Sequence, residues 1–238
     1  ELPPKLFDLP SLQVHCNNKF GLSADHTLKI VQRLYEQKVV TYPRVDTTYL
    51  PNDVYPKVHG ILQKLQPYQQ LVQPLLGKKI RKSSKVFNDK KITDHHAIIP
   101  TGYQVSLGGN EQRVYDSIAR RFIAAFYPDC LVANTTVKGK VADVEFKATG
   151  KEILEPGWRV VLPSKKTNTK ATPNQKTPQK DEKILPTFTV GETGPHVPSF
   201  VEKYTKPPKD YTDASLLRAM ETAGKQIDDD ELRDLMKD

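Results

Sequence analysis

Three side chains able to do chemistry recur at every second position of one short segment. Tyr42, Arg44 and Asp46 follow a run of β-branched residues, and Pro43 disfavours the helical region for the residue before it. In an extended chain, side chains two residues apart project from the same side. The spacing therefore predicts that a phenol, a guanidinium and a carboxylate share one face.

This trio suits a reaction in which a tyrosine attacks a phosphate. A free phenol has a pKa of about 10 and is a weak nucleophile at neutral pH, unless a cation stabilises the phenolate or a base removes its proton. Arg44 can stabilise the phenolate or hold phosphate oxygens in a bidentate fork, and Asp46 can orient Arg44. Taken alone, a Tyr-Pro-Arg tripeptide is more often a strand-to-loop corner in which the tyrosine packs.

A second unusual stretch is the histidine pair His95-His96. Adjacent side chains of an extended strand point to opposite sides, so the pair does not readily chelate one ion. No cysteine or third histidine lies nearby to complete a zinc site, and we expect no metal site here. One histidine can instead hydrogen-bond a phosphate oxygen or transfer a proton, because its ordinary pKa is about 6.5. The alternative is that both histidines are ordinary surface or core residues without a chemical role.

A third feature is the basic segment Gly77 to Lys91, which has seven basic residues and one acid, a net charge of +6. Such spacing offers contacts to a nucleic-acid backbone without sequence readout. Most basic runs are solvated loops, so the segment alone is weak evidence. Its candidate DNA-binding residues are Lys78, Lys79, Arg81, Lys82 and Lys85.

Helices must position these residues in the first half of the chain. The pattern predicts a helix from Thr27 to Lys38, capped by Ser23 or Asp25, with an inward face formed by Leu28, Val31, Leu34 and Tyr35. It predicts a second helix from Glu111 to Phe126, ended by Pro128. The inward residues of the second helix are Val114, Tyr115, Ile118, Phe122 and Phe126.

From Leu131 onward the apolar residues recur with period two, which is typical of half-buried strands. We expect a small antiparallel sheet or barrel from about residue 129 to 205. Its shorter β-like runs are Trp158 to Leu162, Ile184 to Val190 and Val197 to Tyr204. Between them, 163–183 contains six lysines and three prolines without a large apolar side chain, and it is expected to be a mobile loop.

The last segment predicts one more helix. Thr212 caps a run in which Leu216, Leu217 and Met220 share a face, and Gly224 is placed to end it. Residues 226–238 carry six acidic and two basic residues, a net of −4, which is typical of an exposed helical face.

The 238 residues include 36 Lys and Arg against 28 Asp and Glu, a net charge of +8 that suits a polyanionic partner. Without an apolar run of 18 residues, no membrane span is expected. The two cysteines, Cys16 and Cys130, predict buried thiols in a reducing compartment. A sequence that begins with Glu1 and lacks a leader is expected to be an internal piece of a longer protein.

With these segments in view, the chain resembles the type IA DNA topoisomerases, most closely their bacterial topoisomerase III branch. Four separated motifs match in the family's order and cover nearly the whole chain. The matching residues are Gln32-Arg33-Leu34-Tyr35-Glu36, Thr41-Tyr42-Pro43-Arg44-Val45-Asp46, Asp94-His95-His96-Ala97-Ile98-Ile99-Pro100-Thr101, and Lys206-Pro207-Pro208 with Tyr211-Thr212-Asp213-Ala214-Ser215-Leu216-Leu217.

The resemblance implies a role for individual residues. Tyr42 would attack the backbone of single-stranded DNA, form a 5′-phosphotyrosine and release a 3′-hydroxyl, after which strand passage relaxes or decatenates the DNA. Arg44 and His95 would contact the scissile phosphate, and Asp46 would support them. His96 receives no role. Val45 departs from the small polar residue often found there, but it should point away from the active face.

The resemblance also implies what this chain lacks. The acidic Toprim domain, which binds Mg²⁺ and supplies a catalytic Glu and Lys, has no counterpart, so we expect no cofactor in the fragment itself and no relaxation by the fragment alone. Also absent is the Gly-Ile-Gly stretch that usually follows the last helix. The implied fold is multidomain, α and β: a helical domain with the catalytic tyrosine (1–128), a β-rich arch domain (129–206) and the start of a helical base domain (207–238). Implied partners are single-stranded DNA and the remaining domains, for a monomeric, cytoplasmic, nucleoid-associated enzyme.

Two other functions compete with this interpretation. A non-catalytic module would hold single strands by phosphate contact and stacking alone. A rolling-circle relaxase also pairs a tyrosine with histidines, but its two metal-binding histidines are separated by one residue, whereas His95 and His96 are adjacent.

Overall fold

The computed structural model describes residues 1–162, 183–195 and 197–223. Backbone contacts divide it into two units. The helical unit comprises 4–126 together with the described residues from 209 onward, and the strand unit comprises 1–3 with the described part of 127–208. The division into three domains stays a prediction.

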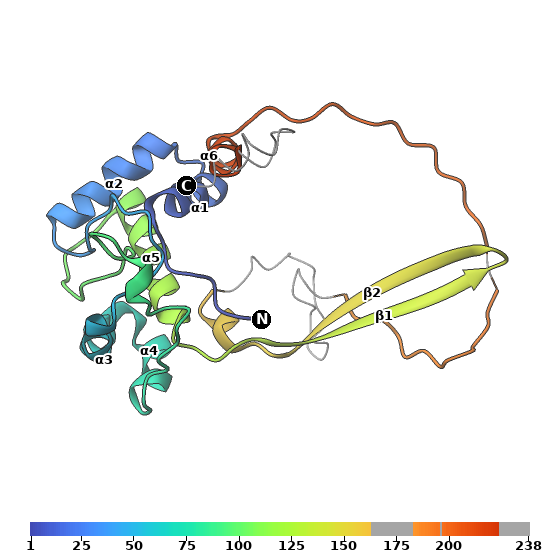
Figure 1. The fold of residues 1–238 in the computed structure, drawn as a ribbon, viewed down its shortest axis with the longest axis horizontal. Helices are drawn as coiled ribbons and strands as arrows, with labels where there is room; N and C mark the ends of the chain where they lie inside the picture. Colours follow the sequence, from blue (N-terminus) through green and yellow to red (C-terminus); the bar gives the residue numbers. More distant parts are fainter. Residues whose placement is uncertain (163–182, 196, 224–238) are drawn as a thin grey trace. The chain divides into compact units, whose positions relative to one another are not determined.

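Helices and short turns build the helical unit. α1 packs against α2 and α6, α2 packs against α5, and α3 packs against α4. Figure 1 shows these elements, which are α1 (Leu9–Phe20), α2 (Ala24–Glu36), α3 (Tyr55–Lys64), α4 (Gln69–Leu76), α5 (Gly109–Ala124) and α6 (Asp213–Glu221), with the 3-10 turns η1 (Asn52–Val54), η2 (Gln66–Tyr68) and η3 (Asp89–Lys91).

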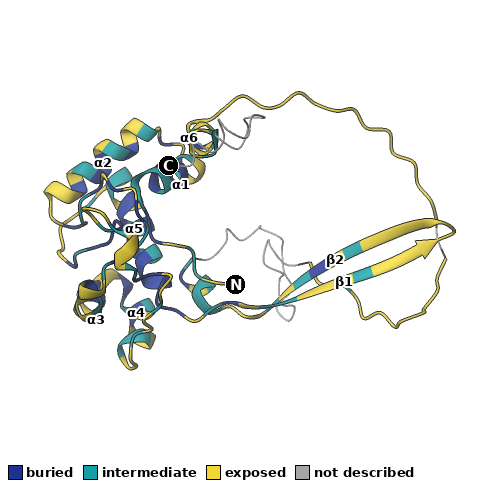
Figure 2. Cartoon of the chain, viewed as in Figure 1, coloured by how far each residue is buried: buried dark blue, intermediate teal, exposed yellow. Residues whose placement is uncertain are grey.

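Helix α2 confirms the predicted helix before the tyrosine, with Ser23 as its N-cap. The predicted inward face was only partly right. Val31 and Leu34 are fully buried, but Leu28 is half-buried and Tyr35 is 39% exposed. The buried stripe is rotated toward Thr27 and Ile30, which leaves Leu28 and Tyr35 at the surface beside the candidate site. Figure 2 shows this half-exposed helix.

Helix α5 carries the predicted core stripe. All five residues expected to face inward are buried: Val114, Tyr115, Ile118, Phe122 and Phe126. The helix ends at Ala124, four residues before Pro128. It supplies the apolar wall against which α2 packs.

Helix α6 begins at the predicted cap. The Thr212 hydroxyl accepts a hydrogen bond from the Ser215 N–H. Two hydrogen bonds tie α6 to the first helices: the Ala24 N–H donates to the Asp213 carboxylate at 2.9 Å, and the Ala214 N–H donates to the Asn17 side chain at 3.2 Å. The predicted stop at Gly224 and the acidic segment 226–238 lie outside the described residues.

The strand unit consists mainly of one long two-stranded ribbon, which Figure 1 shows. β1 (Leu131–Val141) pairs antiparallel with β2 (Val144–Glu155), with Val141 opposite Val144 at the turn and Thr136 opposite Thr149. Most side chains of both strands are exposed (Figure 2). Within the described residues the ribbon is extended only by a single bridge between Lys151 and Lys183, so the expected small sheet or barrel is not formed there. Except for Lys183, the predicted mobile loop lies outside the described residues.

The predicted strand from Trp158 to Leu162 is wrong. This stretch begins with the 3-10 turn η4 (Gly157–Val160). Gly157 has φ +49, and a side-chain Cβ there would lie 2.4 Å from the Asp129 carbonyl oxygen. A left-handed glycine directly after Pro156 turns the chain out of the extended path, and the Trp158 N–H then donates to the Pro128 carbonyl at 3.0 Å.

Both cysteines are free and buried, as predicted from their small number. Among the described residues, no helix is both long enough and apolar enough to cross a membrane.

Candidate active site

The chain reverses direction directly after α2 and then leads to Tyr42. Lys38 adopts φ +63, a left-handed conformation that is uncommon for a residue other than glycine. The Lys38 N–H donates to the Tyr35 carbonyl at 2.8 Å, and the Val39 N–H donates to the Leu34 carbonyl at 3.0 Å. These bonds fix the point at which the tyrosine segment leaves the helix.

Hydrogen bonds of Thr41 join the segment that carries Tyr42 to the segment that follows the histidine pair. Its N–H donates to the Ile99 carbonyl at 3.0 Å, and its hydroxyl accepts the Ile99 N–H at 3.0 Å. The same hydroxyl donates to the Ala97 carbonyl at 3.3 Å, and Val40 pairs with Pro100 next to it. Because backbone and side chain of Thr41 are both engaged, the position of the following tyrosine is set by the second segment.

Burial along the tyrosine segment alternates with period two. Pro43, Val45 and Thr47 are buried, whereas Arg44 and Asp46 are exposed and Tyr42 is half-buried. This alternation agrees with the extended period that the sequence predicts. However, the Val45 N–H donates to the Pro43 carbonyl at 3.1 Å, which makes a tight turn around Arg44 and bends the segment there.

Tyr42 and His95 lie side by side. Their ring centroids are 4.5 Å apart and their planes are inclined by 40°. The ring of Tyr35 also contacts that of Tyr42, with the centroids 5.5 Å apart and the planes nearly perpendicular at 83°. Since His95 itself is exposed, an imidazole stands beside the phenol at a surface that a large substrate can reach.

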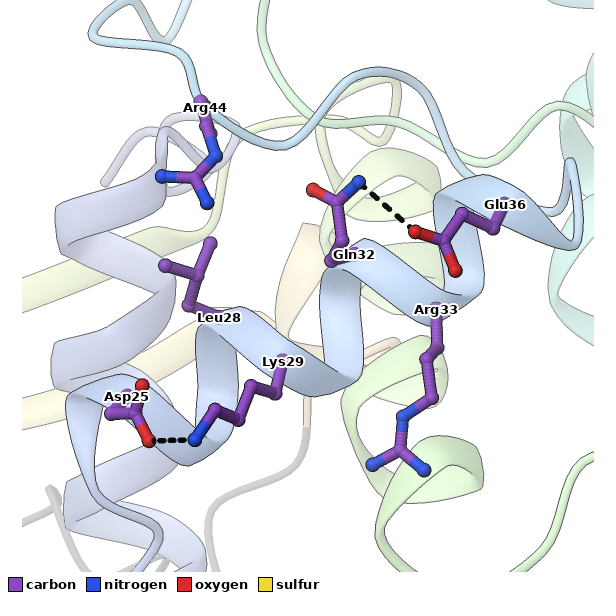
Figure 3. A pocket seen from close by; sticks show the side chains of 7 residues that line it. All are labelled: Asp25, Leu28, Lys29, Gln32, Arg33, Glu36 and Arg44. Atoms are coloured by element: carbon purple, nitrogen blue, oxygen red, sulfur yellow. Dashed lines mark hydrogen bonds and ion pairs between the residues drawn. The ribbon is translucent and has the colours of Figure 1, made fainter.

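Arg44 lies over the outer face of α2. It lines a groove of about 410 Å³ together with residues of that helix (Figure 3). Within the described part of the chain, no carboxylate forms an ion pair with Arg44, whereas Lys29 is paired with Asp25 at 2.7 Å. An exposed guanidinium without a carboxylate partner is suited to binding a phosphate.

Gln32 is a further polar group of this groove that the motif analysis did not single out for a role. Its side-chain nitrogen donates to Glu36 at 3.3 Å, and Figure 3 shows it rising from the helix on the side where Arg44 lies. Its Oε1 atom is buried and accepts no hydrogen bond from the described residues. A buried acceptor normally has a donor, and none of the described residues supplies one here. The i, i+4 spacing of Gln32 and Glu36 on a polar face was the signal that could have found them.

Asp46 lies apart from Arg44. It lines a different cavity, of about 360 Å³, with Lys5 and Lys91 among its neighbours. No hydrogen bond or ion pair joins Asp46 to Arg44 among the described residues, so the expectation that it orients the guanidinium has no support in this geometry.

Asp89, which precedes the histidine pair in the chain, is held by two hydrogen bonds from Asn52. Asn52 donates to its carboxylate from the side chain at 2.6 Å and from the backbone at 2.8 Å. These hydrogen bonds hold the pKa of Asp89 below its ordinary value and keep it charged.

The two histidines of the pair differ in their surroundings. His96 is half-buried and places its Nδ1 atom 2.8 Å from the Ala97 carbonyl oxygen. His95 is therefore the histidine beside the Tyr42 phenol.

The five basic candidates occupy the exposed loop between α4 and η3. The Lys82 ammonium lies 5.2 Å from the centre of the Tyr55 ring, and the Tyr55 hydroxyl donates to the Ile80 carbonyl at 2.8 Å. The cavities beside Arg44 and Asp46 are lined by other residues. The surface formed by Lys78, Lys79, Arg81, Lys82 and Lys85 is therefore separate from these two cavities.

The chain is similar to known proteins over most of its length. The DNA topoisomerase family matches residues 1–225. DNA topoisomerase 3 of Bacillus licheniformis is 38% identical over 226 residues, which is 92% of this chain and 30% of the relative. The enzyme of the same name from Bacillus subtilis is 34% identical over 225 residues, again 92% and 30%. The chain thus spans about 30% of the length of these curated relatives.

A solved structure shares the fold. Full-length topoisomerase I from Thermotoga maritima superposes with a TM-score of 0.59 over 94% of this chain and 35% of the other. The sequences are 23% identical, so this likeness concerns the fold alone.

Proposed function

Because the chain belongs to the type IA DNA topoisomerase family, close to topoisomerase III, we propose that it is the strand-cleaving part of such an enzyme. The observation that carries the proposal is the contact between Tyr42 and His95, which two distant segments create through the hydrogen bonds of Thr41. Family membership disfavours the alternative of a non-catalytic binding module.

In the proposed reaction the Tyr42 oxygen attacks the phosphorus of a phosphodiester in single-stranded DNA. As the new oxygen–phosphorus bond forms, the bond from phosphorus to the 3′-oxygen breaks. The phenol gives its proton to a base, and the departing 3′-oxygen takes up a proton. The products are a 5′-phosphotyrosine and a free 3′-hydroxyl, and the reverse reaction reseals the strand after another strand has passed.

The neighbouring residues supply charge and protons. Arg44, exposed and without a carboxylate partner among the described residues, would pair with the non-bridging phosphate oxygens. His95, beside the phenol, would hydrogen-bond the same phosphate or move a proton. Asp46, in its separate cavity, would at most support this site from a distance.

The family implies Mg²⁺. In the part of the chain that the structure describes, no group of three or more His, Cys, Asp or Glu is placed to hold a metal ion. We assign its ligands to an acidic Toprim domain elsewhere in the enzyme, and derive no step in this chain through the ion. Working partners would be single-stranded DNA and those remaining domains, in a monomeric enzyme of the bacterial cytoplasm.

The test uses the complete enzyme that contains this chain, with Mg²⁺ and a labelled single-stranded oligonucleotide, followed by denaturation and gel electrophoresis. A covalent adduct is expected for the wild type and for Tyr35→Phe, and none for Tyr42→Phe. An adduct that survives in Tyr42→Phe would place the nucleophile elsewhere. DNA binding without any adduct in the wild type would support the non-catalytic module instead.

A further inference from the structure

A second groove lies beside the segment that follows the histidine pair. It measures about 630 Å³, and its lining includes two lysines, Lys38 and Lys64, and no carboxylate. Tyr103 also lines it, with 58% of its surface exposed. The proposed cleavage reaction assigns no role to these three residues.

Hydrogen bonds hold the three segments that form this groove. The Thr101 hydroxyl donates to the Lys38 carbonyl at 2.6 Å and accepts the Tyr103 N–H at 3.1 Å. The Gln104 side chain donates to the Lys64 carbonyl at 2.6 Å. The exposed tyrosine and the two lysines are therefore attached to backbones that are fixed relative to one another.

Gly102 allows this close approach. It has φ +85, and a Cβ at this position would lie 2.7 Å from the Cβ of Lys64. Only glycine combines this conformation with that contact at no cost. The Tyr103 loop can thus lie directly against the end of α3.

The groove is continuous with the backbone pairing that positions Tyr42. The Thr101 N–H donates to the Val39 carbonyl at 3.1 Å, next to the bridge between Val40 and Pro100. Lys38 precedes Tyr42 by four residues, a reach of about 13 Å in an extended chain. At the 3.4 Å spacing of a stacked strand this corresponds to about four nucleotides.

Building on the proposed function, we propose that the Tyr103 groove is a further contact for single-stranded DNA. Tyr103 stacks on a base, and Lys38 and Lys64 bind backbone phosphates. The phosphate at Lys38 lies within about four nucleotides of the phosphate that Tyr42 attacks. Basic grooves with exposed aromatic rings are the usual means of holding single strands. No carboxylate in the lining opposes the phosphates. Stacking on a base and ionic contact with phosphates are both tolerant of base sequence, so we expect little sequence preference from this groove.

The test measures the affinity of the complete enzyme for a fluorescein-labelled oligothymidine of about 15 nucleotides, a length that covers the site size of such grooves. Tyr103→Ala should weaken binding roughly tenfold, whereas Tyr103→Phe, which keeps the ring, should stay within about twofold. Lys38→Gln and Lys64→Gln should each make the slope of log affinity against log salt less negative by about 0.7.

Matched controls come from the same unit. Tyr211 is 66% exposed and lies outside the groove, and Lys57 is an exposed lysine on α3 near Asp53. Tyr211→Ala and Lys57→Gln should leave affinity and salt slope unchanged. If Tyr103→Ala behaves like Tyr211→Ala, the groove is not a DNA contact.

The covalent adduct assay on the same preparations separates the two proposals. Unchanged affinity in Tyr103→Ala, with an adduct that still requires Tyr42, overturns the groove and leaves the cleavage function standing. A wild-type enzyme that binds no single-stranded DNA overturns both.

Discussion

The aromatic rings of Tyr42 and His95 lie 4.5 Å apart between their centroids, at an angle of 40°. The two residues belong to distant segments that the pairing of 39–41 with 97–101 joins. An imidazole beside the phenol can accept its proton or hydrogen-bond the phosphate that it would attack.

Replacing His95 should slow cleavage without abolishing DNA binding. Loss of a positioned acid–base or phosphate-binding group typically costs about 10²-fold in rate. We expect His95→Gln in the complete enzyme to reduce the rate of adduct formation by about that factor. His96→Gln is the matched control, because His96 is turned to the Ala97 carbonyl. Equal rates in the two variants would exclude His95 from the site.

Arg44→Lys should behave as a damaging substitution despite the retained charge. Lysine cannot reproduce the planar fork that binds two phosphate oxygens. The expected loss is on the order of tenfold or more in adduct formation, corresponding to a charge-assisted hydrogen bond of about 1.5–3 kcal/mol. Arg113→Lys, at an exposed position of α5, should have no effect on the same gel assay. A fully active Arg44→Lys enzyme would argue against phosphate binding by this residue.

Thr41→Val should loosen the connection between the tyrosine and the histidine segments. The substitution removes the acceptor of the Ile99 N–H, which is in the buried part of the segment. An unsatisfied group of this kind costs about 1–3 kcal/mol of unfolding free energy. Urea denaturation should show this loss, and cleavage should slow. Thr41→Ser keeps the hydroxyl and should restore both properties, whereas equal stability of the two variants would contradict the role of the hydroxyl.

The extent to which the sequence predicts this structure differs between elements. The core stripe of α5 and the cap of α2 follow from local period and capping chemistry, and both are confirmed. The strand expected at Trp158 fails because Pro156 and Gly157 form a turn whose geometry depends on contact with Asp129, far away in the sequence.

The candidate site shows the same limit. The alternation of burial from Tyr42 to Thr47 was predictable from the period of an extended chain. The turn at Arg44 was not predictable, because it depends on one backbone hydrogen bond between Val45 and Pro43. The contact of Tyr42 with His95 likewise arises from pairing between distant segments. The resemblance to a family implied that both act on one phosphate, but gave no distance.

The stability of the helical unit should fall in mild acid because of His15. Burial lowers the pKa of His15 to about 4, with further lowering by the charges of Arg121 and Lys19, whereas the unfolded chain keeps the ordinary value of 6.5. Between these two pKa values only the unfolded state binds the proton, so stability is lost as pH falls from 6.5 toward 4. Lowering the pH from 7.5 to 5 should cost about 2 kcal/mol.

Urea denaturation of the wild type and His15→Gln at both pH values isolates this contribution. Glutamine does not titrate, so the variant should lose less stability than the wild type by about that amount. His59→Gln, at an exposed position, should retain the wild-type dependence. The same pH dependence in wild type and His15→Gln would contradict the prediction.

The most direct test of the cleavage function is to locate the DNA on the protein. The adduct formed by the complete enzyme is digested with trypsin and nuclease, and the modified peptide is identified by mass spectrometry. Trypsin cleaves after Lys38 and after Arg44, so Tyr42 lies in the peptide 39–44. Tyr35 lies in the peptide that precedes it. The account predicts a nucleotide 5′-phosphate on the peptide 39–44, attached to Tyr42. A nucleotide on any other peptide, including the one that contains Tyr35, would contradict it.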